Sequence, residues 1–167
     1  AYKNHDALLP IVEKVQKISP NIKSIINTIN SGKSDSSYGM PKNLLYGKNF
    51  IIEKLGMYEF EISADSFFQT NSFQALNLYE YIRDEALLSG KETIYDFFCG
   101  TGTISLFLSE KAKKVFGFEI VESAITDAKK NAVRNNVKNA DFFCGDLSKM
   151  LNDYDHIIKN NPCDVLI

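Results

Sequence analysis

The stretch Ile94-Tyr95-Asp96-Phe97-Phe98-Cys99-Gly100-Thr101-Gly102-Thr103 decides the fold class of this chain of 167 residues. An apolar run that ends in a glycine turn and then opens a helical pattern predicts a buried strand, a tight turn and a helix. Gly100 and Gly102 lack a Cβ, so the backbone can turn sharply and a ligand can approach it closely. The next apolar run ends in Glu119, an acid placed to accept hydrogen bonds from a ribose diol. The pattern predicts a nucleoside-containing cofactor on an open α/β sheet.

Two cofactors, NAD and S-adenosylmethionine (SAM), bind to turns of this kind. A dinucleotide fingerprint requires a third glycine, and this chain has Ser105 at that position. Asp96, at the end of the first strand, would repel a pyrophosphate but suits the cationic methionine end of SAM. Asp146 follows a further apolar run, where it could meet an adenine amino group. Three acids at successive strand ends therefore favour SAM over NAD.

The composition is ordinary for a globular protein, with 44% apolar and 24% charged residues. No apolar run approaches the roughly 18 residues of a membrane span, and no secretory signal is visible, so we expect a cytoplasmic protein that does not contact a membrane. The net charge is −2, with eight lysines against five acids in residues 1–60. This slightly basic beginning is compatible with RNA binding, although the asymmetry is small.

Three cysteines, Cys99, Cys144 and Cys163, share no C-x-x-C spacing. Their odd number and spacing argue against a disulfide framework and against a metal site, so we expect no bound metal. Each cysteine lies in or beside an apolar run, and we expect all three to be small buried hydrophobic residues.

The chain divides into three predicted parts. Residues 1–64 form a small α+β segment, residues 65–90 a connecting motif and a helix, and residues 91–167 the first half of a doubly wound parallel sheet. The first part is predicted to contain a helix at 5–19, strands at 25–30, 49–54 and 57–62, and a polar loop at 31–37. In the second part, Asn71-Ser72 is a helix cap, and the apolar stripe of the helix comprises Phe73, Leu76, Tyr79 (or Leu78), Ile82 and Ala86. The third part is predicted to contain strands at 93–97, 114–119, 140–144 and 164–167, and helices at 103–111 and 122–135.

Three motifs resemble the RNA uracil-5-methyltransferase family of the TrmA/RumA type, whose fold is that of class I SAM-dependent methyltransferases. They are residues 66–71 (Ser-Phe-Phe-Gln-Thr-Asn), 96–104 (Asp-Phe-Phe-Cys-Gly-Thr-Gly-Thr-Ile) and 117–121 (Gly-Phe-Glu-Ile-Val). The similarity extends upstream to residues 45–47 and 60–63. Residues 8–30 look most like the bacterial 23S ribosomal RNA branch, so the resemblance implies RNA as the partner, with ribosomal RNA favoured over transfer RNA, and a monomer.

The resemblance also implies which residues bind SAM. Gln69 is similar to a glutamine that contacts SAM from before the first strand of the sheet. The loop around the methionine portion matches Phe98, Gly100, Gly102 and Thr103, and Asp96 precedes it. Glu119 matches the ribose-binding acid and Asp146 the residue near the adenine. Glu119 is expected to have little structural reason to exist. Gln69 and Asn71 could instead cap a helix, and Phe67 and Phe68 could belong to the core.

The family's mechanism needs residues that this chain does not show. Family members add a cysteine thiolate to carbon-6 of uracil, and a carboxylate removes the proton from carbon-5 after methyl transfer. Those residues follow an Asp-Pro-Pro-Arg motif after the fourth strand, whereas this sequence ends at Ile167. We therefore expect no catalytic residue within the chain, which alone should be inactive. Residues 161–163 (Asn-Pro-Cys) are interpreted as a loop, not as an adenine-methyltransferase motif.

Two other functions stay open at this point. One is a SAM-dependent methyltransferase that acts on a small molecule or a protein. The other is a non-catalytic module that binds a nucleotide or RNA. The motif at residues 66–71 argues against the first, and affinity for NAD without affinity for SAM would favour the second or a dehydrogenase.

Overall fold

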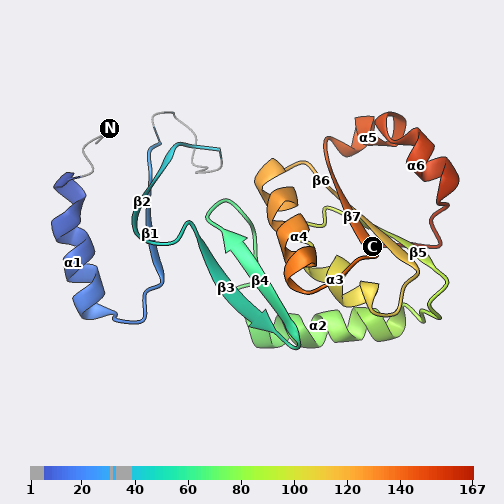
Figure 1. Ribbon diagram of the computed structural model, residues 1–167, viewed down its shortest axis with the longest axis horizontal. Helices are drawn as coiled ribbons and strands as arrows, with labels where there is room; N and C mark the ends of the chain where they lie inside the picture. Colours follow the sequence, from blue (N-terminus) through green and yellow to red (C-terminus); the bar gives the residue numbers. More distant parts are fainter. Residues whose placement is uncertain (1–5, 31, 33–38) are drawn as a thin grey trace. The chain divides into compact units, whose positions relative to one another are not determined.

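The computed structural model describes residues 6–30, 32 and 39–167, which fall into two compact units (Figure 1). Unit 1 is drawn from Ala1–Ile51 and Ser63–Asp65, and unit 2 from Ile52–Ile62 and Ser66–Ile167. Each unit is described by itself. Within the described residues, no helix combines the length and apolar character needed to cross a membrane.

Unit 1 contains a helix and an antiparallel strand pair. A 3₁₀ turn, η1 (Asp6–Leu8), leads into α1 (Leu9–Ile18), and β1 (Ser24–Thr28) pairs with β2 (Lys42–Gly47). The predicted helix and the predicted first strand are confirmed, each with slightly shifted ends. Strand β2 was not predicted. Most of the polar loop expected at 31–37 lies outside the described residues.

Strands β3 (Phe50–Leu55) and β4 (Tyr58–Ser63) form a separate two-stranded sheet around Gly56, as the sequence predicts. In β4, Tyr58, Phe60 and Ile62 are buried because alternate side chains of a strand point to one face. These three side chains belong to the main hydrophobic core of unit 2.

Unit 2 is built on a parallel sheet with the order β7-β6-β5-β8. The strands are β5 (Thr93–Phe97), β6 (Lys114–Glu119), β7 (Ala140–Cys144) and β8 (Val165–Leu166). The first three have the predicted bounds, and β8 lies within the predicted fourth strand. After β7 the chain returns to the other side of β5, so the strand order reverses there. In open α/β sheets such a reversal places a ligand crevice at the carboxyl ends of the strands.

Helices cover both faces of this sheet (Figure 1). They are α2 (Ser72–Glu85), α3 (Thr103–Ser109), α4 (Glu122–Arg134), α5 (Leu147–Asp153) and α6 (Asp155–Asn160). Ile94, Val115 and Phe142 on the strands face the core shared with α2, α3 and α4, whereas Tyr95, Phe116 and Phe118 face an aromatic cluster with α5 and α6. Helices α3 and α4 were predicted; α5 and α6 were not.

The start of α2 confirms the predicted cap, because the Asn71 side chain accepts a hydrogen bond from the Gln74 N–H at 3.0 Å. The predicted apolar stripe is partly wrong. Phe73 is 71% exposed, and the helix is buried through Ala75 and Tyr79, which lie four residues apart. The buried face is therefore rotated away from Phe73.

Candidate functional site

The turn after β5 has an unusual backbone. Phe98, Gly100 and Gly102 all have positive φ angles, of 64°, 55° and 79°. The turn is fixed at its base because the Cys99 N–H donates to the Phe118 carbonyl at 3.0 Å. An aromatic residue in the left-handed region is strained by roughly 1 kcal/mol or more, and such strain gathers at binding sites. The Phe98 side chain is 74% exposed, so burial of its ring does not compensate for this strain.

The two glycines of this turn serve different purposes. A Cβ on Gly100 would meet nothing within 4 Å, so the space in front of its backbone is open to a ligand. A Cβ on Gly102 would lie 2.9 Å from Phe142 and 3.1 Å from Ala128. Gly102 therefore permits the start of α3 to pack closely against Phe142 of β7 and Ala128 of α4. Of these two glycines, only Gly100 leaves room for close approach by a ligand.

Two neighbouring hollows, which share Phe98, lie at the carboxyl ends of the strands. The first hollow, of about 130 Å³, follows the glycine turn, and the second, of about 280 Å³, lies beyond β6 and β7. The predicted residues Gln69, Asp96, Phe98, Gly100 and Thr103 line the first. The predicted residues Glu119 and Asp146, together with Phe98, line the second. The structure thus brings together seven of the eight predicted binding residues, and Gly102 supports the turn from behind.

Asp96 is a buried acid at the first hollow, with only 2% of its surface exposed. Burial raises its pKa to about 6, although a 2.6 Å hydrogen bond from the Ser105 hydroxyl opposes the shift, and the nearby Glu119 charge adds to it. Sequence reasoning noticed Ser105 only as a missing glycine. In the fold, this fully buried side chain holds the Asp96 carboxylate.

Glu119, at the end of β6, organises the backbone around it. Its carboxylate accepts hydrogen bonds from the Gly100 N–H at 3.2 Å, the Ile120 N–H at 2.8 Å and the Val121 N–H at 3.0 Å. The expectation that this acid has little structural reason to exist is therefore wrong. It could not be foreseen because one donor belongs to a turn 19 residues earlier in the chain. Glu119 nevertheless lines the second hollow.

Asp146 also lines the second hollow and immediately precedes α5. Its Oδ1 accepts from the N–H and the hydroxyl of Ser148, at 2.9 and 2.7 Å. These hydrogen bonds lower the pKa of the carboxyl group, so it is ionised at neutral pH. Within the described part of the chain, Oδ2 has no hydrogen-bond partner, which leaves it able to accept from a ligand.

The structure shows where the residues of the motif at 66–71 lie. Phe68 is partly buried against the core, with its ring centroid 5.8 Å from that of Phe60, and it also lines the first hollow. Phe67 is 73% exposed and lines the first hollow together with Gln69. The helix cap is Asn71, so Gln69 has no capping role.

The cysteines depart from expectation. Cys99 is buried as predicted, but Cys144 and Cys163 are exposed, so the prediction of three buried thiols is wrong. Cys144 is the last residue of the edge strand β7, and Cys163 lies in the predicted loop before β8, where neighbouring elements do not cover them. Burial is the main cause that raises the pKa of all three thiols, so none is an activated thiolate. Across the described ranges, no group of three or more His, Cys, Asp or Glu side chains could hold a metal ion.

Comparison with known proteins finds similarity to methyltransferases. Residues 88–166 match the family model described as "Methyltransferase domain". A Bacillus cereus protein named "Uncharacterized RNA methyltransferase" is 44% identical over 81% of this chain and 30% of its own length. A Clostridium tetani protein of the same name is 42% identical over 94% of this chain and 34% of its own length.

One of the similar solved structures contains a bound ligand. It is the Pyrococcus abyssi tRNA (uracil-54, C5)-methyltransferase in complex with S-adenosyl-L-homocysteine. It superimposes with a TM-score of 0.64 at 36% identity, covering 78% of this chain and 32% of that one. The present chain therefore spans about a third of the length of these relatives. Unit 2 has the α/β Rossmann-like fold of SAM-dependent methyltransferases, as predicted, and SAM is the cofactor of that class.

Proposed function

We propose that this chain is the methyl-donor part of a SAM-dependent RNA methyltransferase that modifies carbon-5 of a uridine. The observation that carries the proposal is the pair of neighbouring hollows that share Phe98, one lined by Asp96 and the other by Asp146. Their acids match the chemistry of SAM, which has a cationic amino-acid end, a ribose diol and an adenine amino group.

The proposed pose follows from these groups. The methionine portion lies along the open side of Gly100, between Gln69 and Asp96, and its ammonium group is attracted by the Asp96 carboxylate. The ribose hydroxyls donate to Glu119. The adenine occupies the second hollow between Ile120 and Leu147, where its amino group reaches the acceptor on Asp146.

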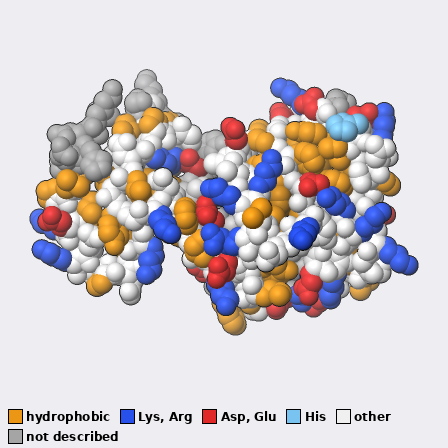
Figure 2. Space-filling model, viewed as in Figure 1, with side chains coloured by type: hydrophobic (Ala, Val, Ile, Leu, Met, Phe, Trp, Pro, Cys, Tyr) orange, Lys and Arg blue, Asp and Glu red, His pale blue; other side chains and the backbone are white. Residues whose placement is uncertain are grey.

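The proposal of carbon-5 of uridine as the methyl acceptor rests on two supports. The motif at residues 66–71 resembles RNA uracil-5-methyltransferases, and the Pyrococcus abyssi relative is named for that reaction on transfer RNA. The sequence resemblance favours ribosomal RNA, so the class of RNA is what an assay must decide. Over unit 2, the face drawn in Figure 2 has Lys and Arg side chains interspersed with Asp and Glu, so RNA contact there would not rest on one basic patch.

The reaction also needs a nucleophile and a base. Carbon-5 of uracil becomes reactive when a thiolate adds to carbon-6, and a base must later remove the carbon-5 proton. Cys99 is buried, and all three thiols have raised pKa values. We propose that both catalytic groups come from a part of the protein beyond this chain.

The test is a mass-spectrometric assay for 5-methyluridine. The gene, expressed over its full coding sequence, is expected to methylate uridine in ribosomal or transfer RNA with SAM as donor, whereas residues 1–167 alone give no turnover. Methylation of a metabolite or a protein instead of RNA would contradict the proposal. Turnover by residues 1–167 alone would contradict the assignment of the nucleophile and base.

A further inference from the structure

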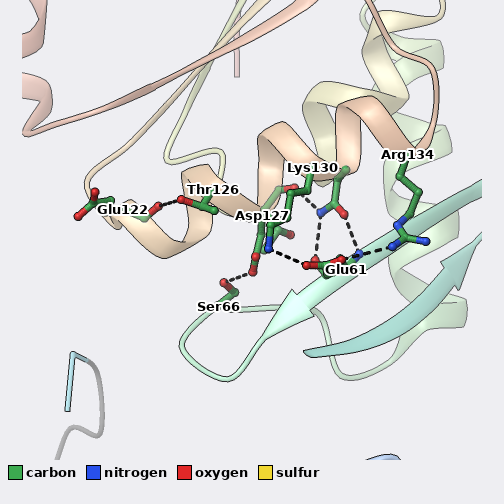
Figure 3. A network of polar contacts seen from close by, with 9 residues as sticks. Glu61, Ser66, Glu122, Thr126, Asp127, Lys130 and Arg134 are labelled. Atoms are coloured by element: carbon green, nitrogen blue, oxygen red, sulfur yellow. Dashed lines mark hydrogen bonds and ion pairs between the residues drawn. The ribbon is translucent and has the colours of Figure 1, made fainter. Parts of the chain in front are cut away.

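Helix α4 carries a row of polar side chains that bond to segments outside the helix (Figure 3). Asp127, Asn131 and Asn135 are spaced four residues apart, the last just past the end of the helix, so they lie on one face. Asp127 is 2% exposed and Asn131 is fully buried. Burying polar side chains costs free energy unless they are hydrogen-bonded, so each position needs its partner.

The two asparagines pair with the backbone of β4 as a neighbouring strand would. Asn131 accepts from the Glu61 N–H at 2.6 Å and donates to the Glu61 carbonyl at 3.2 Å. Asn135 makes the same two bonds with Glu59, at 2.9 and 2.8 Å. Four helical residues rise about 6 Å and two strand residues about 6.8 Å, so the two spacings nearly match. These hydrogen bonds thereby fix the position of β4 along the axis of α4.

Asn131 also reaches the glycine turn. Its Nδ2 donates to the Thr101 carbonyl at 3.1 Å, so one buried amide joins β4 to the turn that contains Gly100 and Gly102. Thr101 is itself 2% exposed. The position of the turn therefore depends on α4 as well as on its own backbone hydrogen bonds.

Asp127 holds the segment that carries Gln69. The Ser66 hydroxyl donates to Asp127 Oδ2 at 2.7 Å, three residues before Gln69. Around this row, the buried Glu61 carboxylate pairs with Lys130 at 2.8 Å and Arg134 at 3.3 Å. Figure 3 shows these groups converging from α4 on β4 and on the loop that follows it.

We propose that Asp127 and Asn131 are positioning residues of the donor site. Asn131 fixes the position of the glycine turn, and Asp127 fixes the position of the segment that carries Gln69. One helix therefore positions two segments that line the first hollow. The inference rests on the proposed SAM site. An apolar helix face would pack as well, but its contacts are non-directional, whereas these hydrogen bonds select one arrangement.

The test measures S-adenosyl-L-homocysteine binding by calorimetry and unfolding by denaturant on the 167-residue chain. Ser66→Ala removes the donor to Asp127, and Ser66→Thr keeps a hydroxyl. We expect Ser66→Ala to weaken binding about fivefold, the worth of one hydrogen bond, and Ser66→Thr to restore most of it. Thr126→Ala is the matched control and should leave affinity unchanged, because among the described residues the Thr126 hydroxyl bonds only to the Glu122 carbonyl within α4.

Asn131→Asp is expected to weaken binding more than Ser66→Ala does. It keeps the size and shape of the side chain but sets a carboxylate oxygen against the Thr101 and Glu61 carbonyls, so we expect binding to fall at least tenfold. If Asn131→Asp does not fold, the Ser66 pair still decides. Unchanged affinity in Ser66→Ala, with a Gln69→Ala variant clearly weakened, would overturn the inference. Absence of binding by the unsubstituted chain would instead overturn the proposed function.

Discussion

Asp96 and Asp146 are both acids that follow parallel strands, yet the fold treats them in opposite ways. Asp96 is buried at the first hollow, and burial raises its pKa to about 6. Asp146 is exposed at the second hollow, and hydrogen bonds from Ser148 lower its pKa. The same residue type thus opposes folding at one end of the site and supports a helix at the other.

The difference predicts how the effect of each acid divides between binding and stability. A buried carboxylate that ionises below neutral pH destabilises the fold, so we expect the Asp96 charge to serve the ligand and not the fold. An acid that caps a helix has a structural reason to be present whether or not it meets adenine. Replacing the acids one at a time therefore separates binding from stability.

The largest effect is expected from Asp96→Asn. Loss of the charge should weaken binding of S-adenosyl-L-homocysteine by roughly tenfold to a hundredfold, the range for a charge-assisted hydrogen bond. The same variant should unfold at higher denaturant near neutral pH because no buried charge has to be accommodated. Calorimetry and denaturant titration check the two halves. Unchanged affinity of Asp96→Asn would contradict the proposed role of the Asp96 charge in binding.

The pH dependence of stability gives the next effect. Because the pKa of Asp96 is higher in the folded state than in the unfolded chain, the folded state binds more protons between these two values, and stability falls as the pH rises from about 4 to about 6. The size is up to about 3 kcal/mol for a shift of this extent. The difference in unfolding free energy between the unsubstituted chain and Asp96→Asn isolates it from other groups. A difference that does not change over this range would show that Asp96 titrates normally.

Glu119→Gln should have an intermediate effect. A glutamine presents an N–H₂ group toward either the Gly100 N–H or the pair from Ile120 and Val121, so at least one backbone donor loses its acceptor. We expect a loss in stability together with a drop of about tenfold in affinity. Loss of stability with unchanged affinity would assign Glu119 to the backbone alone.

Asp146→Ala should have the smallest effect on binding. It removes the bonds to Ser148 and one acceptor for the adenine amino group, so the melting temperature should fall slightly and affinity by about fivefold. Asp146→Asn, which keeps an acceptor for the cap, is the matched variant and should restore most of the stability. If Asp146→Ala weakened binding more than Asp96→Asn, the assignment of the two ends would have to be exchanged.

The strands of the sheet could be predicted because each one is marked by a pattern in its own short stretch of sequence. Each apolar run of 93–97, 114–119 and 140–144 is bounded by turns or helical patterns, and the acids at the ends follow from chain order alone. Helices α5 and α6 were missed because they are two short helices that meet near Tyr154, which interrupts one continuous period.

The residues that hold the site residues in place could not be predicted from the sequence. Ser105 and Asn131 act on partners 9 and 30 residues away, and only the fold brings those partners close. A polar residue on a helix face normally indicates exposure to solvent, so the buried row on α4 had no distinct signal in the sequence.

The most direct test of the account is a crystal structure of this chain with S-adenosyl-L-homocysteine. We predict the amino-acid end beside Asp96 and the open side of Gly100, the ribose hydroxyls on Glu119 and the adenine amino group on Asp146. A ligand bound in the reverse direction, or outside the two hollows that share Phe98, would contradict the account.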